Sequence, residues 1–317
     1  MSIGTSLSIQ FPRPLPLFSL GRTFDSAALV AGKVLTGSRS RTVFTSSAPH
    51  HVLDTKGSGD GVVVLLHGIS SCASDFAPLA YRLRKKFSRI ISIDLLGHGR
   101  TPLPDSSSSD QEVEFSSMSD AVAEVLDQLL RDGEKAVVVG NSMGGMVALK
   151  CAVDHGRLVR GLFLLSPAGA PVDEAELKAI SEMFKIGSLR EGRRFIRRMH
   201  GWRGRRRIGG VLATLMGRAA KYRVEREAVR TIFARALEGG NSFLTPADAE
   251  RVDVECCLFW GKEEKVLEGA KHVQFFRDNL KRLEVLEEEG FGHVPMMDSN
   301  RDIAQHISEF AQRLPSG

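Results

Sequence analysis

The sequence lacks the features that mark several classes of protein. Its four cysteines show neither the paired spacing of a disulfide framework nor the Cys/His pattern of a zinc site. No window approaches the run of about 18 apolar residues that a membrane-spanning helix needs. We therefore expect a globular protein in a reducing compartment, most simply the cytoplasm, with no metal ion. At 317 residues, 42% of them hydrophobic, the chain is long enough to bury a large core.

The N-terminal stretch also lacks the compact apolar core of a secretory signal peptide, because three prolines interrupt it within residues 12–16. It contains Arg13 and Arg22 and has no acidic residue before Asp25. That composition is also typical of a transit peptide or a membrane-associated arm. We interpret residues 1–40 as an N-terminal extension to a globular domain.

Acidic residues are scarce in one part of an otherwise balanced chain. The net charge is only +5, yet residues 191–207 contain eight arginines and one acid. Such a run is either a solvated helix face or a surface for the phosphates of nucleic acid or lipid head groups. A zinc finger, an RNP signature and a GxxG clamp are all missing, so we expect no nucleic-acid partner.

What the sequence does contain is a regular alternation of strand and helix patterns. Continuous apolar runs of strand length are typical of strands covered on both faces. Strands that alternate with helices pair in parallel through right-handed crossovers, so we expect an α/β fold with a mostly parallel central sheet flanked by helices. The expected strands cover residues 41–46, 50–55, 62–68, 89–97, 135–140, 161–167, 255–261 and 282–288. The expected helices cover residues 75–87, 119–131, the segment after 142, 270–280 and 302–313, and a serine-rich loop is expected at 105–110.

The alternation stops between residues 171 and 250. This segment has a helical period, no strong strand pattern, and seventeen basic against ten acidic residues. We interpret it as a helical lid inserted into the core. The core itself would then consist of residues 41–170 and 251–317.

The stretch VVVGNSMGGMVAL, residues 137–149, places Ser142 between Gly140 and Gly144 where a strand pattern gives way to a helix pattern. A nucleophile that attacks from the top of a parallel sheet must project from a sharp strand-to-helix turn, and only small neighbours leave room for that turn. The pentapeptide is thus the G-x-S-x-G pattern of a nucleophile elbow. The amide of Met143, at the start of the helix, is a candidate hydrogen-bond donor to an oxyanion.

The segment HGISS, after the third expected strand, supplies a second candidate donor, the amide of Ile69. Gly68 before it allows the backbone to come close to the serine. His67, before Gly68, and His98, between two glycines, lie early in the chain, before the serine, as does Asp94 in the segment DLLGHG. We interpret them as structural residues of their loops rather than as proton carriers.

A histidine late in the chain is the candidate base. His293, in EGFGHVPMMD, follows the strand at residues 282–288 in a glycine-bounded loop from which an imidazole can reach a serine on a neighbouring strand. Neutral imidazole takes a proton from serine and returns it to the leaving group, since its ordinary pKa of about 6.5 suits both steps. His272 and His306 lie on expected helices and are poorer candidates.

The candidate acid lies in the segment KEEKVL, directly after the strand at residues 255–261. Glu264 is our choice for orienting His293 through its second ring nitrogen. Glutamate is an accepted variant in this role, although its longer arm needs a slightly wider loop. Two alternatives stay open, the neighbouring Glu263 and, after an earlier strand, Asp173.

Six segments together resemble the serine-dependent α/β-hydrolases over about residues 62–310: HGISS, DLLGHGRT, GNSMGG, LLSPAG, LFWGKEEKVL and GFGHVPMMD. Within that group, GNSMGGMVAL, SPAGAP and WGKEEKVL are similar to members of the monoacylglycerol lipase and esterase kind, which carry a helical lid. GNSMGG also resembles hydrolases that cleave carbon–carbon bonds in ring-fission products. Members of both kinds usually have Asp where this chain has Glu264. The resemblance implies the α/β-hydrolase fold with an inserted lid and a Ser–His–acid triad that needs no metal or organic cofactor.

These residues predict a serine hydrolase that cleaves carboxylic esters through a covalent ester on Ser142. The apolar residues of the lid predict a hydrophobic or lipid-like small-molecule substrate, and we assign Phe195 and Trp202 to its binding. In one alternative, the same triad hydrolyses the carbon–carbon bond of a diketone whose carboxylates meet Arg194 or Arg197. In another, the fold serves as a binding protein that has lost catalysis.

The basic lid also predicts peripheral association of the protein with anionic membranes. Its arginines lie beside Phe195, Ile196 and Trp202 in the sequence, and this mixture of charged and apolar side chains suits a lipid surface. The arginines concerned are Arg193, Arg194, Arg197, Arg198, Arg205, Arg206 and Arg207.

Overall fold

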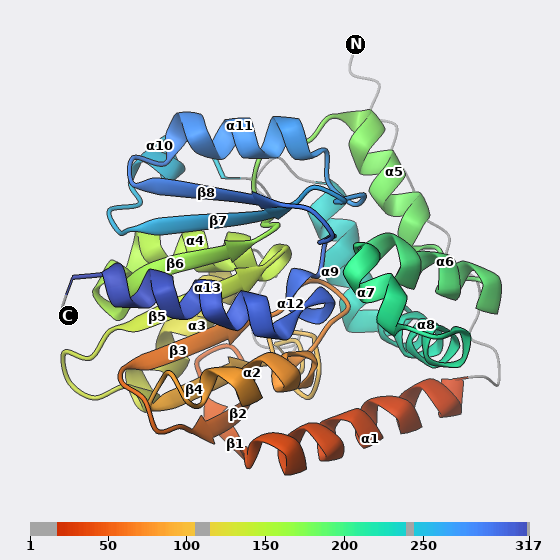
Figure 1. The fold of residues 1–317 in the computed structure, drawn as a ribbon, viewed down its shortest axis with the longest axis horizontal. Coiled ribbons are helices and arrows are strands. Elements are labelled where there is room, and N and C mark those ends of the chain that lie inside the picture. Colours follow the sequence, from red (N-terminus) through yellow and green to blue (C-terminus); the bar gives the residue numbers. More distant parts are fainter. Residues whose placement is uncertain (1–17, 105–114, 239–243, 316–317) are drawn as a thin grey trace.

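An eight-stranded sheet forms the centre of the protein (Figure 1). The computed structural model describes residues 18–104, 115–238 and 244–315, so the serine-rich loop expected at 105–110 lies outside the described residues. The strand order is β1-β2-β4-β3-β5-β6-β7-β8, in which β1 with β2 and β2 with β4 are antiparallel and all later pairs are parallel. The strands are β1 (Arg39–Phe44), β2 (Pro49–Lys56), β3 (Val62–Leu66), β4 (Arg89–Ile93), β5 (Ala136–Asn141), β6 (Val159–Leu165), β7 (Cys256–Gly261) and β8 (Leu283–Glu288). The predicted α/β-hydrolase fold class is confirmed.

Helices cover both faces of the sheet (Figure 1). Strand β3 shows why, because Val63 and Leu65 belong to one core while Val64 and Leu66 belong to the other. The first of these cores is closed by α2 (Ala77–Leu83) and α13 (Asn300–Arg313). The second core is closed by α3 (Phe115–Leu129), α4 (Met143–His155) and α11 (Gly269–Asn279). Shorter turns are η1 (Ala73–Phe76), η2 (Gly156–Leu158) and α12 (Pro295–Asp298).

Between β6 and β7 the described residues form six helices and no strand. They have a small core of their own, in which Phe184, Phe195 and Phe233 pack ring against ring. Helix α6 begins with a capping box, because the Ser188 side chain and the Glu191 side chain each bind a backbone amide of the other. The inserted helices are α5 (Glu174–Phe184), α6 (Leu189–Met199), α7 (Trp202–Arg207), α8 (Gly210–Val224), α9 (Glu227–Glu238) and α10 (Pro246–Glu250).

The N-terminal extension contains a long helix, α1 (Phe18–Thr36), which is not among the helices predicted from the sequence. It runs along the edge of the molecule beneath α8 and α2 (Figure 1). Gly32 makes close packing possible, since a Cβ atom there would lie 2.8 Å from the Cβ of Ala77. A Cβ atom on Gly21 would likewise lie 2.5 Å from the Cβ of Tyr222 of α8.

Arg223 of α8 ties α1 to the rest of the protein. Its guanidinium donates hydrogen bonds to Asp25 of α1, at 2.8 Å, and to Asp75 of η1, at 2.5 and 3.0 Å. Burial acts to raise the pKa of both carboxyls. For Asp75 the charge and hydrogen bonds of Arg223 outweigh it and leave the pKa below its ordinary value, whereas the pKa of Asp25 stays raised. One arginine thus joins the N-terminal helix, the inserted helices and the core.

No helix among the described residues combines the length and the apolar character that crossing a membrane would require.

We expect Arg223→Ala to lower the free energy of unfolding by about 3 kcal/mol or more, because it leaves two mostly buried carboxylates without their partner. Urea unfolding followed by circular dichroism measures the change. Arg157→Ala, which removes an exposed pair with Asp127, is the matched control and should have a much smaller effect. Equal losses in the two variants would contradict the role given to Arg223.

Candidate active site

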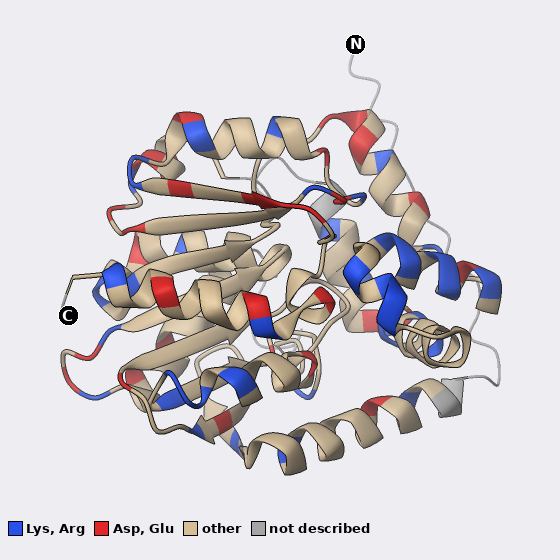
Figure 2. Cartoon of the chain, in the orientation of Figure 1, with Lys and Arg blue, Asp and Glu red and all other residues tan. Residues whose placement is uncertain are grey.

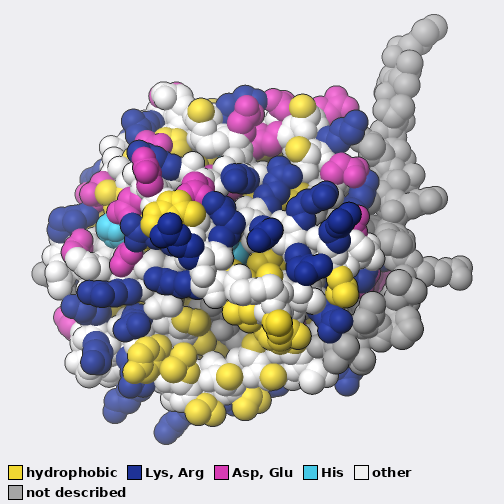
Figure 3. Space-filling model, turned by 45° about the vertical axis from the view of Figure 1, so that its right-hand side comes forward, with side chains coloured by type: hydrophobic (Ala, Val, Ile, Leu, Met, Phe, Trp, Pro, Cys, Tyr) yellow, Lys and Arg dark blue, Asp and Glu magenta, His cyan; other side chains and the backbone are white. Residues whose placement is uncertain are grey.

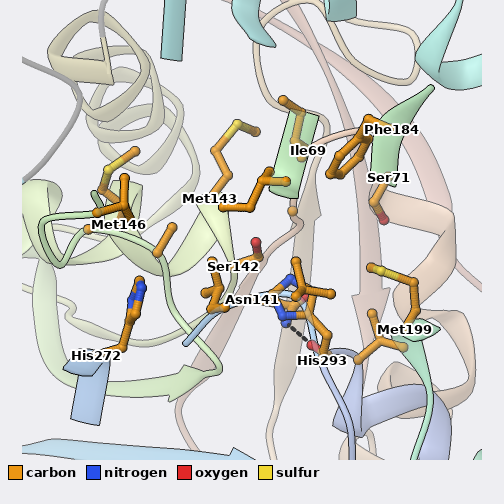
Figure 4. A pocket seen from close by; sticks show the side chains of 18 of the residues that line it. Ile69, Ser71, Asn141, Ser142, Met143, Met146, Phe184, Met199, His272 and His293 are labelled. Carbon is orange, nitrogen blue, oxygen red and sulfur yellow. Dashed lines mark hydrogen bonds between the residues drawn. The ribbon is translucent and has the colours of Figure 1, made fainter. Parts of the chain in front are cut away.

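Ser142 occupies a strained turn between β5 and α4. Its backbone has φ +53° and ψ −120°, a conformation that residues with a side chain rarely adopt. A Cβ atom on Gly144 would lie 2.3 Å from the carbonyl oxygen of Leu66, and one on Gly140 would lie 2.3 Å from that of Gly144. Glycines on both sides therefore allow the strand, the turn and the helix to meet, and the serine projects from the turn into a cavity (Figure 4).

His293 lies beside Ser142, in the loop between β8 and α12 (Figure 4). The side chain of Asn141, next to the serine, donates hydrogen bonds of 2.9 Å to the carbonyl oxygens of His293 and Leu165. The buried carboxylate of Asp298 accepts the amide of Gly292 at 2.7 Å, next to the histidine. Two neighbouring side chains thus hold the backbone of this loop in place.

Glu264, in the loop after β7, binds the ring of His293. Its Oε2 lies 2.8 Å from Nδ1 of the histidine, and its Oε1 accepts the amides of Val266 and Leu267 at 2.7 and 3.3 Å. Burial acts to raise the pKa of this carboxyl, but the charge and hydrogen bond of His293 and the two amides outweigh it and lower the pKa. A carboxylate at Nδ1 favours the tautomer with the proton there, which leaves Nε2 free to accept one.

The cavity at Ser142 has a volume of about 140 Å³ and a mostly apolar wall. Both candidate oxyanion donors, Ile69 and Met143, line it. Met143 is the first residue of α4, where backbone amides have no partner within the helix. Gly68 brings the loop of Ile69 close, since a Cβ atom on it would lie 3.1 Å from the Cβ of Ser142. The inserted helices cover the cavity with Leu177, Ile180, Phe184, Met199 and Phe233.

A family model described as "Alpha/beta hydrolase family" matches residues 63–306. The chain belongs to this family. The match begins in β3 and ends in α13, so it includes both parts of the core and the inserted helices between them.

Curated relatives of this alpha/beta hydrolase differ in activity. It is 26% identical to a pimeloyl-[acyl-carrier protein] methyl ester esterase of Yersinia enterocolitica, over 81% of this chain and 95% of that protein. It is 25% identical to a 2-hydroxy-6-oxo-6-(2'-aminophenyl)hexa-2,4-dienoic acid hydrolase of Metapseudomonas resinovorans, over 71% and 74%. With an uncharacterised protein of Mycobacterium tuberculosis it shares 30% identity over 43% of this chain, a match that spans only 36% of that relative's length.

Solved structures share the fold of this hydrolase at low sequence identity. A bacterial membrane phospholipase A superposes with a TM-score of 0.76 at 21% identity, covering 93% of each chain. Naproxen esterase from Bacillus subtilis superposes with a TM-score of 0.71 at 16% identity, covering 95% of this chain and all of the other. These likenesses support the architecture, not a particular substrate.

The two alternative acids of this hydrolase have other partners. Glu263 accepts hydrogen bonds from Arg205 and from the amide of Trp202. Asp173 caps α5 and pairs with Lys271 at 2.6 Å. Of the three candidates, the structure thus places only Glu264 in hydrogen-bond contact with His293.

His67, His98 and Asp94 hold loops together, as expected. Asp94 accepts the amides of Ala73 and Arg100 at 2.7 and 2.9 Å. His67 binds backbone groups through both ring nitrogens, and burial lowers its pKa. Burial also lowers the pKa of His98 to about 3. His306, on α13, pairs instead with Glu288, away from the cavity.

The two residues assigned to substrate binding do not line the described wall of the cavity at Ser142. Trp202 is 40% exposed, and the guanidinium of Arg206 lies 4.6 Å from the centroid of its ring. Phe195 is buried in the core of the inserted helices and lines a second cavity. The sequence does not distinguish apolar residues that line the cavity from those that form the core of the inserted helices, because the helical period does not show which face meets the substrate.

We expect Gly144→Ala to lower the melting temperature by several degrees, because the new methyl group would overlap the backbone of β3. Differential scanning calorimetry measures the shift. Gly156→Ala is the matched control at the other end of α4, where a Cβ atom meets nothing within 4 Å and φ is −54°. It should be neutral or slightly stabilising. An unchanged melting temperature for Gly144→Ala would show that the turn can accommodate a side chain at this position.

Proposed function

We propose that this hydrolase is a serine esterase that cleaves hydrophobic, lipid-like carboxylic esters through an acyl-enzyme on Ser142. The observation that carries the proposal is the placement of Ser142 beside His293, with Nδ1 of that histidine held by Glu264, in a mostly apolar cavity. Fold similarity alone would not choose this chemistry, because the family supports many reactions.

In the first half of the reaction, the Ser142 hydroxyl attacks the ester carbonyl while Nε2 of His293 accepts its proton. The amides of Ile69 and Met143 bind the oxyanion of the tetrahedral intermediate. The carbon–oxygen bond then breaks, and the leaving alkoxide takes the proton from His293. In the second half, water repeats these steps on the acyl-enzyme and releases the acid and the free serine.

Glu264 has two tasks in this scheme. As an ionised carboxylate it favours the His293 tautomer with the proton on Nδ1, and it stabilises the imidazolium that forms when Nε2 takes the serine proton. The amides of Val266 and Leu267 hold its other oxygen, so the longer arm of glutamate is fixed in one position.

Carbon–carbon bond hydrolysis remains the second candidate, because one relative is named for such a reaction. A ring-fission substrate carries carboxylates that need positive partners. Arg194 and Arg197 are exposed on α6, and no Lys or Arg stands among the described residues that line the cavity. A wall without Lys or Arg favours an uncharged ester over a substrate that carries carboxylates. A dienoate consumed faster than every ester would favour the other reaction.

A second cavity supports a substrate with a long apolar part. It has a volume of about 370 Å³, lies between α1, α6 and α8, and includes Phe24, Phe195 and Met216 in its wall. Ile69 and Met199 line both cavities, so the second space adjoins the one at Ser142. We propose that it receives the part of a long-chain ester that the first cavity cannot hold.

The surface over these helices supports the proposed contact with anionic lipid. Figure 2 shows basic residues gathered on α6 and α7, and Figure 3 shows Lys and Arg side chains beside exposed hydrophobic ones on this side of the molecule. Arg193, Arg194 and Arg197 are exposed, and their guanidinium groups make no hydrogen bond or ion pair with a described residue, whereas Arg198, Arg205 and Arg207 bind backbone oxygens or Glu263. Exposed apolar residues nearby in the fold are Val30 and Val34 of α1 and Val211 and Leu212 of α8.

We expect the wild type to hydrolyse p-nitrophenyl acyl esters and Ser142→Ala to lose at least about a thousandfold in kcat. Glu264→Gln should lose roughly 10³- to 10⁴-fold, because an amide no longer holds the right histidine tautomer. Glu263→Gln is the matched control and should stay nearly as active as the wild type.

A fluorophosphonate probe should label Ser142 in the wild type and fail to label Ser142→Ala. Equal ester turnover by wild type and Ser142→Ala would overturn the proposal. A folded wild type that neither turns over esters nor reacts with the probe would favour the binding-protein alternative. A large loss in Glu263→Gln with none in Glu264→Gln would move the acid to Glu263.

We expect the protein to sediment with anionic phosphatidylserine vesicles at low salt and to be released at high salt. Changing Arg193, Arg194 and Arg197 to Gln together should weaken binding by about a hundredfold, at about 1 kcal/mol for each charge near the lipid surface. The matched control changes the exposed Lys85, Lys86 and Lys281 to Gln and should bind like the wild type. Binding without salt dependence, or equal loss in both triple variants, would contradict the proposed surface.

A further inference from the structure

A second histidine–carboxylate pair lies at the wall of the same cavity. His272 of α11 has its Nε2 3.0 Å from Oε1 of Glu176, on the inserted helix α5. The histidine is 1% exposed and lines the cavity across Ser142 from His293 (Figure 4). Its placement on a helix made it a poor candidate for the base, and the esterase scheme above does not use it.

One ring nitrogen of this pair has no partner. Oε1 of Glu176 also accepts the amide of Glu268 at 2.8 Å, so it acts as an acceptor and Nε2 of His272 donates to it. The second nitrogen, Nδ1, is buried and makes no hydrogen bond with any described residue, and the same holds for Oε2 of Glu176. A buried polar atom left without a partner is destabilising, so it marks a place where a ligand can bind.

The unpartnered nitrogen is an acceptor. Burial lowers the pKa of His272 and outweighs the opposing charge and hydrogen bond of Glu176. The ring is therefore neutral near neutral pH, with its proton on Nε2 and a lone pair on Nδ1. Nearby polar groups that act on it include Glu264 and His293, and the ring of Trp260 packs 5.9 Å away. A group that binds Nδ1 must then donate a hydrogen bond.

The position of His272 indicates which part of the ester would carry the hydrogen-bond donor. His293 must reach the leaving oxygen to return a proton, so the alcohol part lies toward His293. His272 lies on the other side of Ser142, next to the wall formed by Met146 (Figure 4). We therefore expect the acyl part of the substrate to extend toward His272.

We propose that His272 is a specificity-determining residue whose Nδ1 accepts a hydrogen bond from a hydroxyl or amide N–H group on the acyl chain of the substrate. This inference rests on the proposed esterase function. Glu176 acts as a positioning residue, because it holds the ring by Nε2 and thereby leaves Nδ1 as the acceptor. The preferred acid is thus a hydroxylated or amide-bearing chain rather than a plain fatty acid.

The test uses pairs of methyl esters that differ only in one hydroxyl or one amide N–H group on the acyl chain, placed at different carbons along it. We expect the wild type to prefer at least one hydroxylated or amide-bearing ester in kcat/KM over its plain partner. His272→Leu should lose roughly ten- to a hundredfold on that ester and keep its activity on the plain one, because only the donor-bearing substrate then lacks its acceptor. His272→Asn places an amide oxygen near the Nδ1 position and should restore part of the preference.

His306→Leu is the matched control, since it removes a histidine–carboxylate pair on α13 and should leave the preference unchanged. No preference in any ester pair, or an equal loss on both members in His272→Leu, would overturn the inference and leave the pair as a link between α5 and α11. Absence of turnover on every ester would instead contradict the proposed function.

A binding measurement tests the role of His272 independently of the proposed esterase function. Hydroxylated and plain acids should be titrated into Ser142→Ala, with its melting temperature as the readout. We expect the hydroxylated acid to stabilise it more than the plain acid does, and His272→Leu in the same background to abolish the difference. Equal stabilisation by both acids would contradict the role of His272 whether or not the enzyme turns over esters.

Discussion

The backbone turn at Ser142 is the constraint on which the candidate site depends. A φ of +53° is unfavourable for a serine, and it persists because the surrounding backbone leaves no other path. β3, β5 and α4 approach one another so closely that Gly140 and Gly144 have no room for a side chain. The same close approach places Ser142 and the first residue of α4 in the wall of one cavity. Strain in the turn and access of the serine are therefore two results of one packing arrangement.

The parallel sheet brings the other two side chains to the same end. β5, β7 and β8 all lie in the parallel part of the sheet, so the loops that follow them emerge on one side. Glu264 comes from the loop after β7 and His293 from the loop after β8. Burying a carboxylate is unfavourable unless hydrogen bonds compensate, and here one imidazole and two amides do so. The site thus combines a rigid serine with a histidine whose ring orientation is fixed.

Local signals in the sequence predict most of the sheet, Ser142 and His293, and they favour an acid in the loop after β7. Ser142 is marked by its glycines, and Glu264 and His293 each lie in a loop directly after a predicted strand. The chain cannot reveal in the same way which of two neighbouring glutamates reaches the histidine. That choice follows from Arg205, on an inserted helix, which holds Glu263 elsewhere.

Features that depend on distant partners escape the sequence reading. Helix α1 has few buried apolar residues of its own and gains its contacts from α2 and α8. The pairing of His272 with Glu176 joins residues 96 positions apart. Arg207 looks like a free charge in its basic run but donates to the carbonyl oxygen of Asp298. Trp202 looks like a pocket residue but lies at the surface, where its backbone amide donates a hydrogen bond to Glu263. Tertiary contacts decide each of these cases.

Trapping of the covalent intermediate tests the central claim most directly. The protein is mixed rapidly with an excess of a p-nitrophenyl acyl ester, quenched in acid and digested, and the peptides are analysed by mass spectrometry. We predict one acyl group per chain, on the hydroxyl of Ser142, formed as fast as the first p-nitrophenolate is released. Ester turnover with the acyl group on another residue, or with no acyl-enzyme at any time in the reaction, would contradict it.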